Sequence, residues 1–292
     1  MHLRLQKNIL SNSSSLGCKP IGVMDSGVGG LSVLHHINNL MPHESLTYVA
    51  DSQYAPYGNL SSEKITERCF EIADFLIAQG VKALVVACNT ATAASIRLMR
   101  AKYTLPIIGM EPAVKPAALA SKNGVVGVLA TVGTLESAQF AALLTTYGQD
   151  IKVHTQGCVG LVECIERGDT NTSGTKKLLT QYCTPLLNAG ADTIVLGCTH
   201  YPFVRDLILE IVNKDITIID TGAAVAKHLQ TTLEAQALIM QVELEPNITI
   251  WTNNVARDRE SVIRKLWNKD DAKIKIMRHI PVPLEDTSEQ TG

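Results

Sequence analysis

The sequence predicts an α/β protein made of two similar three-layer α/β domains with mainly parallel sheets. The two domains are expected to be related by a pseudo-two-fold axis, with the active site in the cleft between them. Two observations lead to this prediction. Short strands that are apolar on both faces alternate with helix-like stretches, which is typical of a parallel sheet covered on both sides. In addition, strand motifs of the first half recur in the second half.

The first half is expected to alternate strictly between strands and helices. Its helices are recognised by apolar residues that recur every three or four positions, such as Ile65, Ile72 and Leu76. Its strands are short apolar runs that end in Gly-rich or polar turns. In order, the expected elements are strand 21–24, helix 30–40, strand 46–50, helix 62–79, strand 83–87, helix 92–103 and strand 107–108.

The second half repeats the first at a nearly constant distance. The matching segments are 21–26 with 126–131, 83–89 with 193–199, and 107–108 with 218–219, at offsets of 105, 110 and 111 positions. Three pairs in the same order indicate two related α/β halves. Ligands of open α/β sheets bind beyond the carboxyl ends of the strands, so a ligand is expected between the two halves.

The chain after about Thr221 does not continue the repeat. We expect a helix over 223–233 and a strand over 247–251 there. Because the second half ends at Ile219, this segment is expected to pack back onto the first half. The expected division is a disordered polar leader over 1–19, a first α/β domain over 20–115 plus 222–292, and a second α/β domain over 116–221.

Composition and charge exclude several classes of protein. The 292 residues carry a net charge of −2 with both signs interspersed, which disfavours a nucleic-acid surface. No apolar run approaches the roughly 20 residues that a membrane-spanning helix needs. The polar leader lacks the apolar core of a secretory signal. We therefore expect a cytoplasmic protein, monomeric or homodimeric, with no nucleic-acid partner and no membrane segment.

Two of the seven cysteines occupy matching positions in the repeat. Cys88 and Cys198 each follow an apolar strand and precede polar residues that suit a helix N-terminus. Free N–H groups at such a terminus favour a thiolate and bind carboxylates. The repeat brings both thiols to one cleft, which favours a functional pair over two structural thiols. A redox disulfide between them stays an alternative, although Cys-X-X-Cys spacing is lacking. Structural roles are expected for Cys18, Cys69, Cys158, Cys164 and Cys183.

Polar residues beside these cysteines are further candidates. Asp25 opens a Gly-rich turn that lacks both the GxGxxG pattern and the Lys of phosphate-binding loops. An acid at this place suits a substrate ammonium group or a catalytic acid, and a plain capped turn is the alternative. His200 could control the proton balance of Cys198. Metal binding by Cys198 and His200 is disfavoured, because no second pair with ligand spacing accompanies them.

Four motifs together resemble the glutamate racemase family, whose wider relatives are the cofactor-independent aspartate and hydantoin racemases. They occur in family order between about Ile21 and Ala226. Aspartate racemases typically carry Glu where this sequence has His200, which favours glutamate as the substrate. The motifs are Asp25-Ser26-Gly27-Val28-Gly29-Gly30-Leu31, Tyr57-Gly58, Cys88-Asn89-Thr90 and Gly197-Cys198-Thr199-His200-Tyr201-Pro202.

The resemblance implies that L- and D-glutamate are interconverted, with D-glutamate supplied for peptidoglycan and no pyridoxal phosphate, metal or flavin needed. It implies that Cys198 deprotonates L-glutamate, assisted by His200, and that Cys88 deprotonates D-glutamate, assisted by Asp25. A further acidic family position should fall on Glu163. Some members need a peptidoglycan precursor as activator, so such a precursor is a candidate partner. The implied substrate contacts are Asp25, Ser26, Tyr57, Gly58, Asn89, Thr90, Thr131, Thr199 and His200.

Two thiols suit this chemistry because inversion removes a proton from one face of Cα and delivers one to the other face. An ordinary thiol pKa of about 8.5 lets one cysteine be thiolate while the other is protonated. Without an electron-sink cofactor, convergent N–H groups would have to stabilise the carbanion. The alternatives are an aspartate or other amino-acid racemase of this family, a two-lobed amino-acid-binding protein, and a thiol oxidoreductase.

Overall fold

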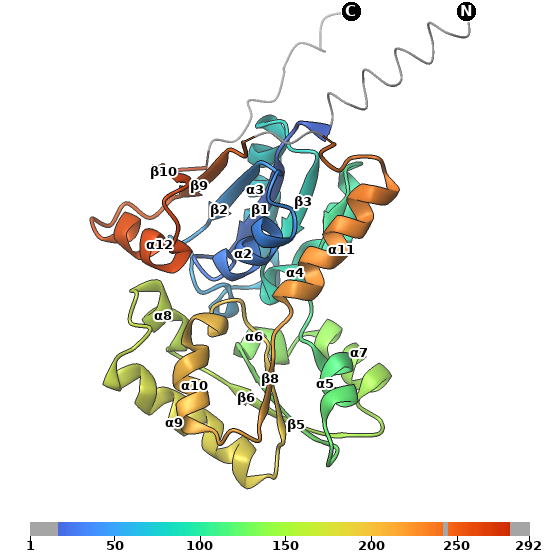
Figure 1. Ribbon diagram of the computed structural model, residues 1–292, viewed down its shortest axis with the longest axis vertical. Helices are drawn as coiled ribbons and strands as arrows, with labels where there is room; N and C mark the ends of the chain where they lie inside the picture. Colours follow the sequence, from blue (N-terminus) through green and yellow to red (C-terminus); the bar gives the residue numbers. More distant parts are fainter. Residues whose placement is uncertain (1–16, 242–244, 281–292) are drawn as a thin grey trace, which may run out of the picture.

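Two α/β units stacked along the long axis form the computed structural model (Figure 1), which describes residues 17–241 and 245–280. One unit contains a six-stranded sheet, sheet A, and the other a four-stranded sheet, sheet B. The strands of sheet A are β1 (Ile21–Asp25), β2 (Leu46–Ala50), β3 (Ala83–Val86), β4 (Ile107–Ile108), β9 (Ile248–Thr252) and β10 (Ala272–Ile276). Those of sheet B are β5 (Val125–Ala130), β6 (Lys152–Gly157), β7 (Thr193–Leu196) and β8 (Thr217–Ile219).

The helices connect these strands and cover both sheets. They are α2 (Leu31–Leu40), α3 (Ser62–Ala78), α4 (Asn89–Lys102), α5 (Val114–Ala120), α6 (Val132–Leu135), α7 (Ala138–Tyr147), α8 (Leu161–Glu166), α9 (Ser173–Asn188), α10 (Arg205–Ile211), α11 (Gly222–Ala235) and α12 (Arg259–Trp267). Two short 3₁₀ helices, η1 (Tyr57–Asn59) and η2 (Tyr201–Val204), follow β2 and β7. No helix among the described residues is long and apolar enough to cross a membrane.

The repeat seen in the sequence is present in the strand order. Sheet A contains the order β2-β1-β3-β4 and sheet B the order β6-β5-β7-β8, so each strand of the second set occupies the place of its counterpart in the first. Neighbouring strands pair in parallel in both sheets. The predicted fold class, two similar α/β halves with parallel sheets, is confirmed.

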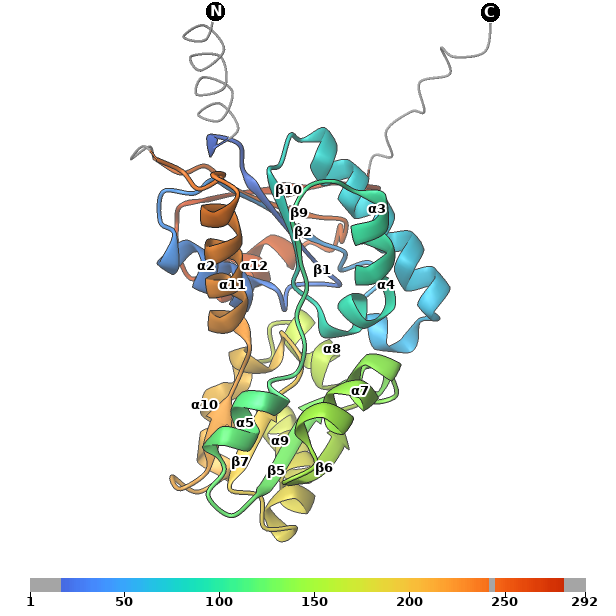
Figure 2. The ribbon, with the colours of Figure 1, turned by 90° about the vertical axis from the view of Figure 1, so that its right-hand side faces the viewer.

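Sheet A is covered on both faces, which explains why its strands are apolar throughout. All five residues of β1 and of β2 are buried. One face packs with α2, α11 and α12, and the other with α3 and α4, as Figure 2 shows. Burial on both sides removes the alternation of apolar and polar residues that a half-exposed strand would have.

The segment after α11 extends sheet A. β9 pairs with β2 from Leu46 opposite Ile248 to Ala50 opposite Thr252, and β10 pairs with β9. The expected strand at 247–251 thus lies one residue further along, whereas α12 and β10 were not expected. The domain boundaries themselves stay a prediction. Most of the leader at 1–19, and residues 242–244 and 281–292 of the first domain, lie outside the described residues.

The last helix of each half packs on the other half. α5 follows β4 of sheet A but packs against β7 and β8 of sheet B, whereas α11 follows β8 but packs against α2 and β4. The chain therefore crosses between the units twice, near 109–113 and near 220–221. These crossings lie side by side (Figure 2), and the place where they pass is called the hinge below.

Candidate active site

Cys88 lies at the N-terminus of α4, directly beyond the end of β3. Its Sγ accepts a hydrogen bond from the backbone N–H of Ala91 at 3.4 Å and lies 3.8 Å from the hydroxyl of Ser26. Burial raises the pKa of the Cys88 thiol well above its ordinary value, and the nearby Asp25 carboxylate raises it further. Both effects favour the protonated form of Cys88.

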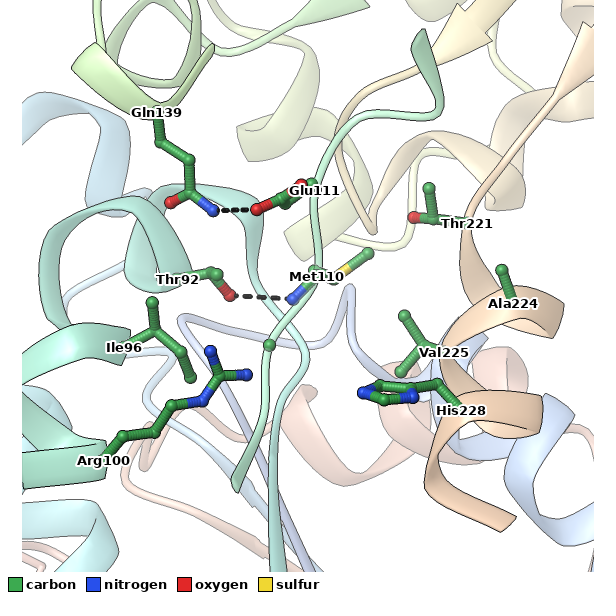
Figure 3. Close-up of a pocket in the computed structure, with 11 residues that line it drawn as sticks. Thr92, Ile96, Arg100, Met110, Glu111, Gln139, Thr221, Ala224, Val225 and His228 are labelled. Carbon is green, nitrogen blue, oxygen red and sulfur yellow. Dashed lines mark hydrogen bonds between the residues drawn. The ribbon is translucent and has the colours of Figure 1, made fainter. Parts of the chain in front are cut away.

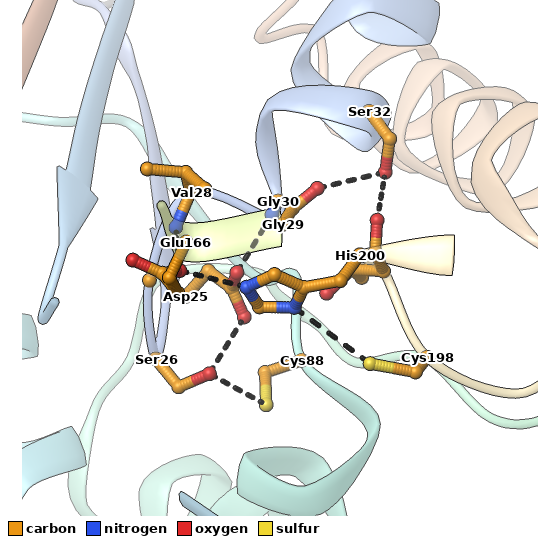
Figure 4. Close-up of polar contacts among 12 residues, drawn as sticks. Asp25, Ser26, Val28, Gly29, Gly30, Ser32, Cys88, Glu166, Cys198 and His200 are labelled. Carbon is orange, nitrogen blue, oxygen red and sulfur yellow. Dashed lines mark hydrogen bonds and ion pairs between the residues drawn. The ribbon is translucent and has the colours of Figure 1, made fainter. Parts of the chain in front are cut away.

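Asp25 lies behind Ser26 at the end of β1 (Figure 4). Its Oδ2 accepts a hydrogen bond from the backbone N–H of Gly30 at 2.6 Å, and its Oδ1 accepts one from the Ser26 hydroxyl at 3.5 Å. Burial raises the pKa of Asp25 to about 6, despite the opposing effects of His200 and the Gly30 bond. Ser26 thus links the Asp25 carboxylate to the Cys88 thiol. The Asp25 carboxylate can change its charge near neutral pH.

Cys198 follows β7 and belongs to a different chain of contacts. Its Sγ lies 3.7 Å from His200 Nδ1, and His200 Nε2 lies 2.7 Å from Oε1 of Glu166. Burial lowers the pKa of His200, but its bonds to Cys198 and Glu166 outweigh this effect and raise the pKa well above its ordinary value. The charged form of His200 is thereby favoured, and it lies beside the sulfur of Cys198. The two thiols therefore have opposite environments.

Glu166 is the acid that the sequence analysis missed. Burial alone would raise its pKa, but hydrogen bonds from His200 and from the backbone N–H of Val28 hold the pKa below its ordinary value. The structure brings Glu166 to His200, whereas the role expected for Glu163 stays a prediction. Glu163 lies one turn earlier on α8 and lines a neighbouring cavity with Pro56 and Val159. Glu163 was expected from the family resemblance alone, and that resemblance did not point to Glu166.

The Gly-rich turn after β1 makes room for this chain of contacts. A Cβ on Gly27 would overlap the carboxylate of Glu166, and a Cβ on Gly29 would overlap the ring of His200. Both of these partners come from the sheet B unit. The glycines are thus required for close packing between the two units, which is a different use from the phosphate-binding turn that they superficially resemble.

Both thiols line one narrow cavity between the two sheets. Of the expected substrate contacts, all but Asp25 line it. Tyr57 contributes its ring, because its hydroxyl donates to Asp51 Oδ2. Pro56, Thr134 and Val162 were not expected there. The lining residues are Ser26, Pro56, Tyr57, Gly58, Cys88, Asn89, Thr90, Thr131, Thr134, Val162, Gly197, Cys198, Thr199 and His200.

Polar groups for a ligand converge on this cavity. Both amide atoms of Asn89 are buried and have no hydrogen-bond partner among the described residues, which favours a ligand that supplies one. The hydroxyls of Thr90, Thr131 and Thr134 lie 3.0 Å from one another and join the two units. These polar groups and both thiols thus lie around one cavity, which is the candidate substrate site.

A second cavity lies at the hinge, apart from the thiols (Figure 3). α4 contributes Arg100, α7 contributes Gln139, and the two crossings contribute Glu111 and Thr221, with His228 from α11. The hydroxyl of Thr92 accepts a hydrogen bond from the backbone N–H of Met110 at 3.1 Å, which fixes the first crossing. Any molecule bound here would touch both units.

Three comparisons with known proteins identify the family. Residues 21–229 match the family model of Asp/Glu/hydantoin racemases. The glutamate racemase of Pseudomonas paraeruginosa is 51% identical over 258 residues, which are 88% of this chain and 97% of that protein.

Solved structures give the same picture. Glutamate racemase isoform RacE1 from Bacillus anthracis has a TM-score of 0.81 at 33% identity, covering 89% of this chain and 97% of that one. The Escherichia coli glutamate racemase in complex with L-glutamate and the activator UDP-MurNAc-Ala has a TM-score of 0.80 at 29% identity, covering 89% and 98%.

The fold and these comparisons define a racemase, a kind of isomerase, in which both thiols line one cavity between the two α/β units. The chain belongs to the Asp/Glu/hydantoin racemase family. The relatives and solved structures named above are all glutamate racemases.

Proposed function

We propose that this racemase interconverts L- and D-glutamate by a two-thiol mechanism, with Cys88 and Cys198 acting on opposite faces of Cα. The observation that carries the proposal is that both sulfurs line one cavity, from two different units, with opposite electrostatic environments. The role of each site residue is part of the proposal.

In the direction from L to D, the Cys198 thiolate removes the Cα proton of L-glutamate and becomes a thiol. The Cys88 thiol then delivers its own proton to the opposite face of Cα and becomes a thiolate. His200 stabilises the charge of Cys198 before the step, and Asp25 acts on Cys88 through Ser26. The reverse direction exchanges the two roles, so no proton needs to leave the cavity within a turnover.

Negative charge that develops beside the substrate carboxylate requires nearby donors. The Asn89 amide and the first turn of α4 supply donors on one side, and the turn at Thr199 and His200 supplies them on the other. Burial of the cavity strengthens these interactions because little water competes. The mechanism relies on this electrostatic stabilisation and calls for no cofactor.

The product D-glutamate would be supplied to peptidoglycan synthesis in the cytoplasm. A peptidoglycan precursor is proposed as an activator, because the Escherichia coli relative was solved with one. The hinge cavity is the proposed place for it, since it touches both units without reaching the thiols. The initial rate of racemisation should then rise when UDP-MurNAc-Ala is added, and a rate independent of it would exclude such activation.

The direct test is to incubate the purified protein with L-glutamate and no added cofactor, and to measure D-glutamate. Racemisation is expected, with little turnover of L-aspartate under the same conditions. Absence of D-glutamate would overturn the proposed function, and comparable turnover of L-aspartate would overturn the choice of substrate.

The roles of the thiols are tested by Cys88→Ala and Cys198→Ala. Each variant should lose racemisation in both directions, because every turnover uses both groups. A glutamate analogue with a leaving group on nitrogen needs only deprotonation, after which elimination follows. Cys88→Ala should still process the L-analogue and Cys198→Ala the D-analogue. The loss on the other enantiomer should exceed the ~10²–10⁴-fold of an ordinary acid/base effect. Equal losses on both enantiomers would mean that neither cysteine is specific to one face.

A further inference from the structure

Arg259, the first residue of α12, enters the active-site region from the C-terminal segment. Its Nη1 donates to the side-chain Oε2 of Glu166 at 2.9 Å and to the backbone carbonyl oxygen of Glu166 at 2.7 Å. Both side chains are buried, with 8% and 9% of their surface exposed. The segment that matches the racemase family model ends at residue 229, so Arg259 lies 30 positions beyond it.

The carboxylate of Glu166 accepts hydrogen bonds from residues of both units. Its Oε1 accepts hydrogen bonds from Val28 N at 2.6 Å and from His200 Nε2 at 2.7 Å, and its Oε2 accepts from Arg259. Val28 and Arg259 belong to the sheet A unit, whereas Glu166 and His200 belong to the sheet B unit. The rotation of the carboxylate, and with it the position of the imidazole, is thus fixed by a residue of the opposite unit.

Hydrogen bonds connect this chain of contacts to only one of the two thiols. It runs from Arg259 through Glu166 and His200 to the sulfur of Cys198. Cys88 is linked by hydrogen bonds to Ser26 and through it to Asp25, and Arg259 bonds to neither of them. His200 and Glu166 act on Asp25 only through their charges, and these two effects oppose each other. Loss of the guanidinium would leave Oε2 of a buried carboxylate without its charged partner, and such a group reorients or takes up a proton.

We propose that Arg259 is a positioning residue for the Cys198 base, acting through Glu166 and His200 so that the C-terminal segment completes one half of the active site. This inference rests on the two-thiol mechanism proposed above. Under this proposal, α12 affects the reaction of one substrate enantiomer. A helix that only packed against the sheet would not have such an effect.

The test compares Arg259→Gln and Arg259→Lys with the wild type in elimination from the two enantiomers of the glutamate analogue. Racemisation rates cannot separate the thiols, because each turnover uses both. For Arg259→Gln, kcat should fall about 10- to 100-fold on the enantiomer that depends on Cys198, by analogy with the loss of a partner that orients a metal ligand. On the other enantiomer kcat should change by less than about 3-fold. His200→Asn should give the same pattern. Arg259→Lys, which retains the charge, should restore part of the lost rate.

Arg264→Gln is the matched control, since Arg264 lies on the same helix and pairs with Glu260 in an exposed ion pair. It should leave both elimination rates unchanged. Thermal unfolding of each variant is measured in parallel, and Arg259→Lys serves if Arg259→Gln does not fold.

Equal losses on both enantiomers, or no loss on either, would overturn the role of Arg259. A wild-type protein without racemase activity, or a Cys198→Ala variant without preference for one enantiomer, would instead overturn the proposed function. The two failures are therefore distinguishable.

Discussion

Some ionisable side chains in this active site are buried, although burial disfavours their charged form. Asp25 is an example, because its carboxylate is buried at the end of β1 and its pKa is raised to about 6. A buried carboxylate is disfavoured in its charged form, yet the charged form is the one that can assist Cys88 through Ser26. The group therefore contributes to function at the expense of stability near neutral pH.

We expect Asp25→Asn to raise the free energy of unfolding at pH 8, and to raise it less at pH 5. Because the pKa is higher in the folded state than its ordinary value of 3.8, the bound proton stabilises the fold fully below about pH 4. That stabilisation is lost as the pH rises through 6, and its full size is about 3 kcal/mol. Urea unfolding at the two pH values measures the difference. A gain in stability that does not depend on pH would contradict this account, whereas racemisation should be strongly reduced in either case.

The sequence located the thiols but not all of their partners. Cys88 and Cys198 could be predicted because each follows a strand, and the ends of parallel strands meet at one edge. Glu166 could not be predicted, because its orientation depends on Val28 and Arg259, which lie more than 90 positions away. For Tyr57 the sequence could not show that its hydroxyl is already engaged by Asp51.

Among the elements, the turn between β1 and α2 is the one most closely fitted to its surroundings. Gly29 leaves no space for a Cβ because the ring of His200 occupies it. Gly29→Ala should therefore displace His200 and reduce racemisation by about 10-fold or more, since small misplacements of catalytic groups are costly. Circular dichroism should show a folded protein.

Gly174→Ala is the control for this substitution. Gly174 lies in the first turn of α9, where the nearest atom to an added Cβ is 3.8 Å away. Its racemisation rate should equal that of the wild type. If Gly29→Ala also kept the wild-type rate, the turn would not be fitted to His200 as described.

The C-terminal elements could be predicted from sequence patterns only in part. β9 was predicted, since its apolar residues form a short buried run like those of the repeat. β10 is an edge strand with Lys273 and Lys275, and it reads as a polar stretch in the sequence. α12 has no counterpart in the first half, so the repeat offered no template for it. The fold of the repeated part was thus predictable, whereas the extension of sheet A required the tertiary structure.

At the scale of the whole molecule, we expect the two units to unfold together. α5 and α11 each leave their own half to pack on the other, so unfolding either unit removes a covering helix from the other. Trp251 and Trp267 both belong to the sheet A unit. Tryptophan fluorescence therefore reports that unit alone, whereas far-ultraviolet circular dichroism reports both. The two denaturation curves should coincide, as in a two-state transition. Separate midpoints would show that the units unfold independently.

The exchange of the two last helices has a consequence for what half of this chain could be. A half by itself would expose the apolar face of its last helix and leave part of its own sheet bare. Two identical copies could cover both exposed surfaces by exchanging their last helices around a two-fold axis, with one sulfur from each copy in a shared site. The present chain has the form of such a dimer joined into one polypeptide. Joining removes the identity of the copies, so that Cys88 can have an aspartate and a serine beside it while Cys198 has a histidine and a glutamate. A dimer of identical chains would have to give both faces of the substrate the same base.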